Sequence, residues 1–463
     1  MGQSQEARFE SYADVMTQTL GHADRAQPAR WYMRGLMLPG ARKSVEPMAA
    51  RVHPQNVRSA HQAMHHLVAD SEWSDQALLT AVARQVAPAL TAGQVPCYWI
   101  IDDTGFRKYG KHSAGVARQY CGQLGKTDNC QVAVSLSLAT TEGSLPLDWR
   151  LYLPKEWTDD KARCQRAGVP REVAFATKGE IAWAQIEAAL EAGPDAGIAR
   201  GTVLMDAGYG DEAALRDRLS ERELVYAVGI RPATAVWWGE HQPADAPVQA
   251  VRGRRRSRLI RDDTHRPVGV RELAQALPSG SYRTLTWREG TNAPLRSRFA
   301  RVRVRAAHAD RPREEEWLLI EWPAGESEPT RYFLSTLPAD ITFKALVATV
   351  KMRWRIERDY RELKQEVGLG HYEGRNWRGF HHHASLCIAA YGFLMIERLA
   401  GVKKNAARFK APALPEGFRP RGAGADAASR PVVDHHRALS PRSRHRPQPA
   451  ALPLLRKTSH ANQ

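Results

Sequence analysis

Apolar residues recur at helical spacing through the first 95 residues of the chain. The stretches that show this spacing are residues 9–20, 55–68 and 74–89. Ser74 and Asp75 stand at the start of the last stretch, where a side-chain oxygen can cap the free N–H groups of a helix. We therefore predict a helical domain over residues 1–95. Its Arg- and His-rich segment, residues 51–66, suits either a small DNA-binding module or the polar surface of an ordinary helical domain.

The pattern changes at Cys97, where short apolar stretches begin to alternate with helical ones. CYWIIDDTG is typical of a strand that ends in two aspartates, and NCQVAVSLSLAT followed by SLPLDWRLYLP is typical of a hairpin across a Glu-Gly turn. A helix is expected after Thr177, ending at Gly193, and GTVLMDAGYG predicts a further strand that ends in an aspartate. One more helix and strand follow. This mixed order predicts an α/β sheet core over residues 96–230.

Residues 231–338 are irregular and rich in strand patterns. EEWLLIEWP and TRYFLSTLP predict strands, and RVRVR alternates so that its arginines share one face. We predict a β-rich insertion in this region, after which the core resumes over residues 339–400. The end of this second part, FHHHASLCIAAYGFLMIERLA, is expected to be a buried helix. Residues 401–463 are rich in Pro, Arg and Ala and are predicted to be a basic, disordered tail.

The charge and the cysteines narrow the choice of partner and compartment. The net charge is +17 and the pI is near 9.9, and 13 Lys/Arg against 3 Asp/Glu in residues 401–463 supply +10 of that charge. Such a surplus favours a polyanion, either nucleic acid or an anionic membrane. No apolar run approaches the roughly 18–20 residues of a membrane span, so DNA is favoured. The five cysteines form no C-x-x-C pair, which indicates a reduced, cytosolic chain without zinc or disulfides.

The segment KMRWRIERDYRELKQEVG, residues 351–368, is expected to form one charged helix. At roughly 100° per residue, Arg353, Glu357 and Lys364 fall on one stripe of that helix. The other two glutamates fall on the opposite side. A solvated helix with ion pairs between its turns would show the same pattern, so the stripe alone does not decide between a surface and a site.

Three carboxylates stand out by their position in the predicted core. Asp103, or its neighbour Asp102, ends the first strand, Asp206 ends a later strand, and Glu357 lies on the charged stripe. One aspartate at the end of a strand is usually a turn residue, but three carboxylates brought together need a cation between them. Mg²⁺ suits this role, because it takes oxygen ligands from one or two carboxylates and from substrate phosphates. Two such ions can assist the cleavage of a phosphodiester, with the Arg and Lys of the stripe as phosphate contacts.

These residues resemble a DDE transposase of a bacterial insertion sequence, in the branch marked by a Tyr-Arg-Glu-Lys signature. Arg353, Glu357 and Lys364 stand at the spacing of that signature, and Val350 takes the place of its tyrosine. The segments GLMLPGARKSVEPMAARV, GKHSAGVARQYCGQLGKTDNCQVAV and EGRNWRGFHHHASL are also similar to one subgroup of these transposases. The resemblance extends over about residues 97–400.

The resemblance implies a ribonuclease-H-like catalytic core with a β-rich insertion, preceded by a helical N-terminal DNA-binding domain. It implies that Asp103, Asp206 and Glu357 are catalytic and hold two Mg²⁺ ions, which Mn²⁺ can replace. The implied reaction is hydrolytic nicking at the ends of the element, followed by strand transfer of the freed 3′-hydroxyl to another phosphodiester. The implied partners are double-stranded DNA, as inverted repeats and target, and a second copy in a synaptic homodimer. The implied location is the cytoplasm, at the nucleoid.

Two aromatic residues and one choice between aspartates complete the expected site. The resemblance implies that Trp354 and Tyr332 stack on a flipped base, because every base has a π-face. Packing in the protein core is the alternative for both residues. Asp102 competes with Asp103 for the role of first metal ligand. Strand alternation puts the two on opposite faces, and we assign the role to Asp103.

Other patterns and rival functions carry less weight. GQLGKT is similar to a phosphate-binding loop, but its spacing is too short and no strand directly precedes it. The run His381-His382-His383 is expected to pack in the interior or to face DNA, because three adjacent rings cannot easily reach one ion. The rival functions are a non-mobile ribonuclease-H-like endonuclease and a domesticated DNA-binding protein without catalysis. The presence of all three acids argues against the second rival.

Overall fold

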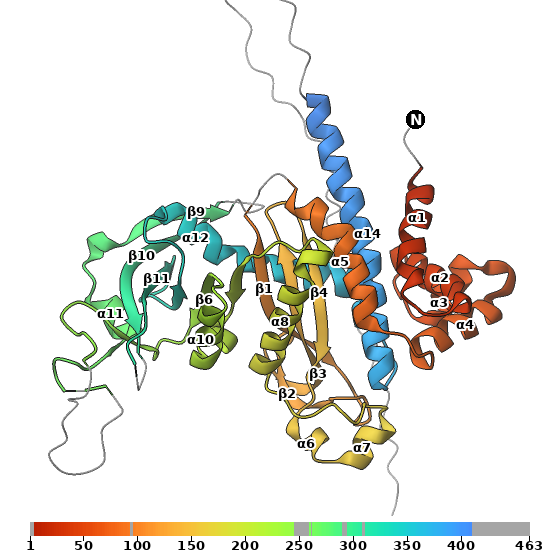
Figure 1. The fold of residues 1–463 in the computed structure, drawn as a ribbon, viewed down its shortest axis with the longest axis horizontal. Helices are drawn as coiled ribbons and strands as arrows, with labels where there is room; N and C mark the ends of the chain where they lie inside the picture. The colour runs from red at the N-terminus through yellow and green to blue at the C-terminus, as the bar shows by residue number, and fades with distance from the viewer. Residues whose placement is uncertain are drawn as a thin grey trace, which may run out of the picture. The chain divides into compact units, whose positions relative to one another are not determined.

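The described strands all belong to one mixed sheet, which is drawn in Figure 1. The computed structural model describes residues 4–92, 96–244, 259–260, 262–288, 294–307 and 311–409. The strands are β1 Tyr98–Arg107, β2 Ala117–Cys121, β3 Lys126–Ala139, β4 Ser144–Leu151, β5 Thr202–Met205, β6 Tyr226–Ile230, β7 Ala235–Trp237, β8 Val268–Gly269, β9 Arg283–Arg288, β10 Leu295–Ala306, β11 Glu315–Pro323 and β12 Arg331–Ser335. Their order is β2-β3-β1-β5-β6-β12-β11-β10-β7-β8, with β4 on β3 and β9 on β10.

The helices fall into a group before β1 and a set that flanks the sheet. The α-helices are α1 Gln5–Gln18, α2 Ala26–Met37, α3 Val45–Val52, α4 Val57–Ala69, α5 Asp75–Thr91, α6 Lys155–Thr158, α7 Lys161–Arg166, α8 Lys178–Ala196, α9 Ala207–Gly210, α10 Ala213–Glu221, α11 Val270–Ala276, α12 Phe343–Lys351, α13 Arg355–Arg361 and α14 Trp377–Phe409. The described residues belong to one compact unit, Met1–Phe409. The expectations for residues 410–463 lie outside the described part of the chain.

Strand β1 is central to the part of the sheet that carries the candidate site. It runs antiparallel to β3 over its whole length and parallel to β5 at its start, and β5 runs parallel to β6. Trp99, Ile100 and Ile101 are fully buried, as expected for a strand covered on both faces. The sequence suggested that the strand ends at its two aspartates. In the structure the strand continues through them to Arg107. The aspartates therefore have fixed, alternating directions.

The hairpin and the first long helix of the core were largely predicted. Strands β3 and β4 pair antiparallel, which confirms the hairpin. Thr177 caps α8 in a reciprocal capping box with Glu180. The helix does not end at Gly193 but continues to Ala196, and it ends because Gly197 adopts a left-handed conformation with φ of 66°.

The β-rich region extends the core sheet instead of forming a sheet of its own. Strand β12 pairs antiparallel with β6, and β11 and β10 follow outward from it. The predicted strands EEWLLIEWP and TRYFLSTLP are confirmed as β11 and β12. In β10, the guanidinium groups of Arg301 and Arg303 lie 4.5 and 4.8 Å from the ring centroid of Trp317, so these arginines cover an indole. The basic run at residues 254–258 lies outside the described residues.

The three helices predicted before β1 are confirmed as α1, α4 and α5, whereas α2 and α3 were not predicted. Ser74 caps α5 by accepting from the Ala77 N–H at 3.1 Å. They do not stand apart as a separate domain. Helix α5 packs along α14, and the Tyr12 hydroxyl of α1 donates to the Ala389 carbonyl of α14 at 2.9 Å. The N-terminal helices and the last described helix therefore share one hydrophobic core.

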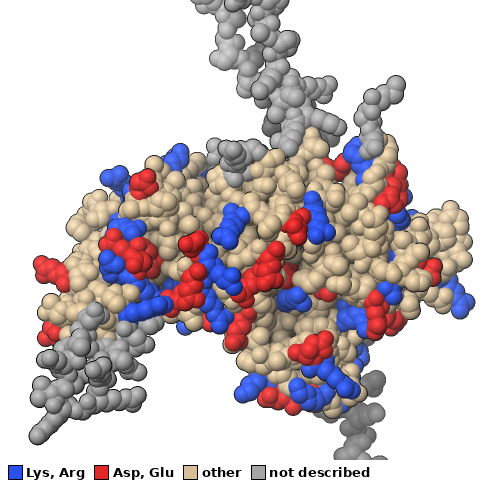
Figure 2. Space-filling view, viewed as in Figure 1, with Lys and Arg blue, Asp and Glu red and all other residues tan. Residues whose placement is uncertain are grey.

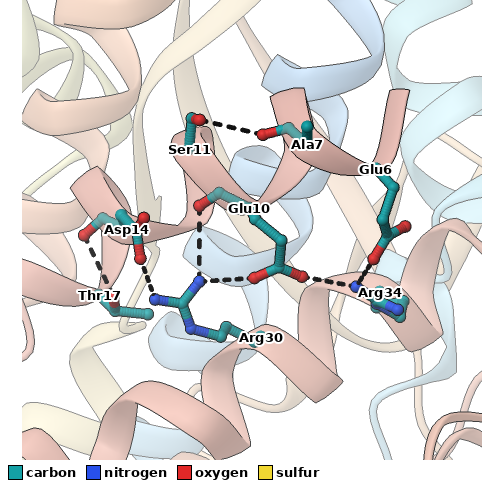
Figure 3. Close-up of polar contacts among 8 residues, drawn as sticks. All are labelled: Glu6, Ala7, Glu10, Ser11, Asp14, Thr17, Arg30 and Arg34. Atoms are coloured by element: carbon teal, nitrogen blue, oxygen red, sulfur yellow. Dashed lines mark hydrogen bonds and ion pairs between the residues drawn. The ribbon is translucent and has the colours of Figure 1, made fainter. Parts of the chain in front are cut away.

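Ion pairs also hold α1 against α2, as Figure 3 shows. Arg30 reaches Glu10 at 2.9 Å and also contacts Asp14. Arg34 reaches the other oxygen of Glu10 at 2.6 Å and also contacts Glu6. Single exposed pairs contribute about 0–1 kcal/mol, but carboxylates shared between two arginines form a network that fixes the register of the helices.

Helix α14 is the buried helix expected from the sequence. Its part Trp377–Gly401 is long and apolar enough to cross a membrane by length and composition, contrary to the expectation that no such run exists. In this protein 67% of the apolar window is buried against other elements, so core packing explains the composition. The histidine triplet packs in the interior, because His381, His382 and His383 are all buried. Interior packing was one of the two expectations for the triplet, and the other was a surface that faces DNA.

The segment around Glu357 is not the single regular helix that the sequence suggested. Helix α12 ends at Lys351, a 3₁₀ turn follows at Met352–Trp354, and α13 begins at Arg355. After α13 a π-helical turn spans Glu362–Glu366. Each interruption changes the rotation per residue, so a uniform 100° step cannot give the direction of every side chain. Such interruptions are frequent at functional sites.

Candidate active site

The candidate site lies where β1 runs past the end of β5. The parallel register pairs Tyr98 with Thr202 and Ile100 with Leu204. The same offset brings Asp102 level with Asp206, which follows β5 directly and caps the short helix α9. The Asp206 carboxylate accepts from the Gly208 N–H at 2.8 Å and is thereby fixed at the edge of β5.

Alternation along β1 sends its two aspartates to opposite faces of the sheet. Asp102 pairs in register with Ser135 of β3, and the Ser135 hydroxyl lies 2.8 Å from the Tyr360 hydroxyl of α13. Asp102 therefore faces α13. Asp103 faces the other way, where it accepts from Lys178 of α8 at 2.9 Å and from the Tyr209 hydroxyl at 3.1 Å.

Arg353 is the charged group around which the acids of the α13 face gather. Its guanidinium donates to Asp102 at 2.6 Å and lies 3.9 Å from the Glu357 carboxylate. Burial lowers the pKa of Arg353, but the negative charges of Asp102, Asp206 and Glu357 outweigh burial and raise it. The three acids that act on this guanidinium include Asp102 and do not include Asp103.

The same charges appear in the ionisation of Asp102. The pKa of its carboxyl is raised to about 7, chiefly by burial and also by the charge of Asp206, while Arg353 acts in the opposite direction. A carboxylate with this pKa is held in its charged form by a nearby cation, as expected for acids that share one small volume. Asp102 and Asp206 are therefore electrostatic neighbours.

The residues have the donor chemistry for a hard divalent cation, although the geometry is not that of a bound metal. Among the described residues, no three His, Cys, Asp or Glu side chains lie close enough to share one ion. Glu357 points outward, with 72% of its side chain exposed. The negative charges of Asp102, Asp206 and Glu357 all act on Arg353, and carboxylate oxygens are the ligands that Mg²⁺ prefers.

Comparisons with known proteins show the family of the chain. A family model described as DDE superfamily endonuclease matches residues 15–294. The chain belongs to this family of endonucleases. A segment of 171 residues is also 33% identical to a probable transposase for the insertion sequence element IS701 of Microchaete diplosiphon. That segment covers 37% of this chain and 40% of the relative, so the chain matches less than half of the relative's length.

The family match includes three of the acids discussed but ends before the fourth. Asp102, Asp103 and Asp206 fall inside residues 15–294, and Glu357 falls outside them. The connection of Glu357 to the site therefore rests on Arg353, which pairs with Asp102 and lies four residues before Glu357 on the chain. Glu357 lies in the first turn of α13.

Lys364 and Val350, the other positions of the expected signature, both lie against the protein interior. Lys364 is turned toward β1, where its ammonium donates to the Thr104 hydroxyl and the Gly105 carbonyl, each at 2.7 Å, and burial lowers its pKa to about 8. Val350, in the place of the signature tyrosine, is buried in α12. Its position supplies no hydroxyl.

The two aromatic residues expected to stack on a base differ from each other. Trp354 is half-buried, and the guanidinium of Arg288 from β9 lies 4.0 Å from its ring centroid. Tyr332 is only 2% exposed, and its hydroxyl donates to the Pro329 carbonyl at 2.7 Å. Tyr332 packs in the core of the sheet, so stacking on a base would require its ring to leave that position.

Sequence reasoning missed the partners of Asp103 and of the α13 face. Lys178 and Tyr209 lie 75 and 106 residues from Asp103 along the chain, and no motif connects them. Tyr209 follows Asp206 by three residues, which is a usable signal: the loop that fixes one acid also reaches its neighbour. Tyr360, buried beside Asp102, could be found from its place three residues after Glu357, one turn along the helix.

Proposed function

We propose that the protein is a transposase that hydrolyses phosphodiester bonds at the ends of a DNA insertion sequence and transfers the freed strand to a target. The family membership supports the endonuclease step, and the similarity to the relative supports transposition. One observation carries the assignment to this site: the Arg353 guanidinium lies 2.6 Å from Asp102 and 3.9 Å from Glu357, and Asp206 stands level with Asp102 at the end of β5. Two of these acids come from adjacent parallel strands and one comes from α13.

The proposal includes a ribonuclease-H-like core. It is supported by the strand order β2-β3-β1-β5-β6, in which β1 is antiparallel to β3 and parallel to β5. It is also supported by a helix, α13, that brings an acid to the carboxyl end of the central strands. Carboxyl ends of parallel strands are a common place for active sites in such sheets.

Asp102, Asp206 and Glu357 would hold Mg²⁺, with Asp102 replacing Asp103 as the first ligand. The reason is direction: Asp102 faces α13 and Arg353, whereas Asp103 is bonded to Lys178 and Tyr209 on the other face. When bound, a pair of such ions activates the attacking oxygen and stabilises the leaving oxygen of a phosphodiester. Mn²⁺ has the same ligand preference and would support the reaction.

The remaining residues of this face bind and orient the DNA. Arg353 would bind DNA, because its planar guanidinium, which pairs with Asp102 here, also suits a phosphate. Trp354 presents an indole beside Arg353, with Arg288 over its ring, in a position to stack on a base. Lys364 is held under β1 by Thr104, and in this arrangement it positions the strand more directly than it contacts DNA.

The test is incubation of the full chain with Mg²⁺ and a DNA that carries the inverted repeats flanking its own gene. End-specific nicking followed by joined products is the expected result. Glu357→Gln should abolish nicking, and Glu366→Gln, an exposed glutamate of the same segment, should not change it. Nicking without joining would point to a non-mobile endonuclease. Full cleavage by the Glu357 variant would overturn the site assignment.

A second copy of the chain is part of the proposal, because two DNA ends must be joined to one target. Analytical ultracentrifugation of the protein with and without end DNA measures this. A mass of two chains on paired ends is expected. One chain bound to two ends would contradict it.

A further inference from the structure

Residues 107–129 lie at the far end of β1 and include none of the acids of the proposed site, and we refer to them as the β2–β3 arm. It contains the last residue of β1, the loop that follows, all of β2 and the first part of β3. Its sequence carries five Lys/Arg and one Asp. The face of the molecule in Figure 2 shows basic and acidic side chains intermixed, so the net charge of the chain does not by itself locate a DNA surface.

Two exposed tyrosines distinguish the arm from an ordinary charged loop. Tyr109 is 90% exposed and Tyr120 is 61% exposed, and these are the most exposed of the large hydrophobic side chains in the described part of the chain. The guanidinium of Arg107 lies 5.1 Å from the ring centroid of Tyr109 and covers one of its faces. The other face is open for a planar partner. Isolated exposed apolar residues are common, but exposed aromatics set among cations are typical of surfaces that bind single strands.

The direction of the arm connects it with the candidate site. Arg118 pairs with Asn129 and Tyr120 pairs with Thr127 of β3. Because side chains alternate along β3, both residues project to the face that also carries Ser135, the register partner of Asp102. Arg118 and Tyr120 therefore lie on the same face of the sheet as the proposed first metal ligand.

The distance between the arm and the site is short, and one contact joins them. Arg107 is five residues from Asp102 on the same strand, which corresponds to about 17 Å at roughly 3.4 Å per residue. At the tip of the hairpin the Gln123 amide oxygen accepts from Lys364 at 3.2 Å. A DNA strand that lies along this face would run from the acids to the arm.

We propose that the β2–β3 arm binds a DNA strand with unpaired bases next to the cleavage site. Tyr120 would stack on a base and Arg118 would contact a phosphate on the face of the acids. Arg107, which covers Tyr109, pairs in register with Cys130 and reaches Asp128 at 3.4 Å on the other face. Tyr109, Lys111 and Lys126 would therefore contact the strand where it passes around the end of the hairpin. A single strand fits better than a duplex, because a stacked pair of bases leaves no face for a tyrosine ring to cover. The inference rests on the proposed function, since it names the strand on which that site acts.

The test measures binding in the absence of Mg²⁺, so it does not depend on cleavage. Fluorescence anisotropy of the full chain with a labelled 20-nucleotide oligo(dT), and with a duplex of the same length, gives both affinities. The variant Tyr109→Ala/Tyr120→Ala should bind oligo(dT) at least tenfold more weakly, because stacking contributes about 1–3 kcal/mol per base. The duplex affinity should change less. Tyr109→Phe/Tyr120→Phe should restore oligo(dT) binding, since the ring is kept.

A matched control and a salt series complete the experiment. Phe175→Ala removes an exposed aromatic residue that lies outside the arm, and it should leave oligo(dT) binding unchanged. Replacing Lys111, Arg118 and Lys126 by Ala should reduce the dependence of log affinity on log salt by about 0.7 per contact. Oligo(dT) binding within twofold of the original in the Tyr-to-Ala variant would overturn the proposal. If the Tyr-to-Ala variant lost self-association but kept its DNA binding, the proposal would also be overturned, because the arm would then be a protein interface. The absence of end-specific nicking by the parent protein with Mg²⁺ would instead overturn the proposed function.

Discussion

The two faces of β1 carry neighbouring aspartates in contrasting surroundings. On one face Asp102 meets Arg353 at 2.6 Å, beside Asp206 and the buried Tyr360. On the other face Asp103 is already satisfied by Lys178 and the Tyr209 hydroxyl. One face therefore concentrates acids around one shared cation, and the other gives each charge its own partner. Adjacent residues of the same type can thus have separate roles, because successive side chains of a strand point to opposite faces of the sheet.

The difference in charge balance between the two faces of β1 indicates which face needs a cation in addition to Arg353. The charges on the Asp103 face are balanced by one ammonium and one hydroxyl. On the Asp102 face three carboxylates act on one guanidinium, so the balance is incomplete without a further positive charge. The Asp102 face is the one suited to a metal ion and to DNA.

The largest expected effect is on the rate of nicking, and it comes from mutating each of the two aspartates in turn. Asp102→Asn should lower the rate of Mg²⁺-dependent nicking by about a thousandfold, because the electrostatic work of a bound metal is several kcal/mol. Asp103→Asn should lower it by about tenfold or less, since it acts on the position of its neighbours. Single-turnover cleavage of a labelled end DNA gives both rates. The reverse order of the two variants would restore Asp103 as the first ligand.

The second expected effect is on stability, and it measures the charge of Arg353 independently of catalysis. Arg353→Gln leaves Asp102, Asp206 and Glu357 without their shared cation and should lower the free energy of unfolding by about 3 kcal/mol. Mg²⁺ should recover more stability in this variant than in the parent protein, because it supplies the missing charge. Thermal unfolding with and without Mg²⁺ measures both. The control is Arg358→Gln, which breaks a surface pair with Glu362 and should cost about 0–1 kcal/mol.

Much of the fold was accessible from the sequence because it depends on local patterns. The alternation around CYWII, the cap at Ser74 and the capping box at Thr177 are each written within a few residues. The opposite directions of Asp102 and Asp103 also follow from alternation. Which of these faces meets α13 does not, because that choice depends on how a segment about 250 residues later packs against the sheet.

The helix that carries Glu357 shows a second limit. Its stripe was derived for a regular α-helix, but a 3₁₀ turn and a π turn interrupt the segment. Arg353 and Glu357 remain near each other because they flank one short junction. Lys364 lies beyond α13 in the π turn, and its ammonium turns under β1. Packing against the sheet, which no local pattern records, decides its direction.

The third expected effect concerns acid stability on the Asp102 face, where α14 lies behind α13. Burial lowers the pKa of His383 from 6.5 to about 4, and its ring is positioned by the Tyr32 hydroxyl and the Gly368 carbonyl. The His383 side chain therefore binds fewer protons in the folded state than in the unfolded state between these two values, and its contribution to stability falls as the pH decreases from 6.5 to 4. The pKa of the buried His382 is also lowered to about 4 and acts in the same direction, whereas the raised pKa of Asp102 acts in the opposite direction. The full effect corresponds to about 3 kcal/mol.

His383→Gln should flatten this part of the stability curve, because the amide can keep a hydrogen bond and does not titrate. Urea unfolding at intervals of pH gives the curve. His65→Gln, which changes an exposed histidine of α4, is the matched control and should leave the slope as it is. The same slope in His383→Gln and in the parent protein would show that this histidine does not contribute to acid stability.

The smallest expected effect tests whether the Asp103 face is as self-contained as its contacts indicate. Tyr209→Phe removes the hydroxyl that donates to Asp103 at 3.1 Å but keeps the buried ring. Hydrogen bonds to charged groups contribute about 1.5–3 kcal/mol, and the remaining bond from Lys178 should hold the loss near about 1.5 kcal/mol. Nicking by this variant should stay within a few-fold of the parent, because Asp206 keeps its backbone donor at Gly208. A loss of nicking as large as that expected for Asp102→Asn would mean that the two faces of β1 act as one site.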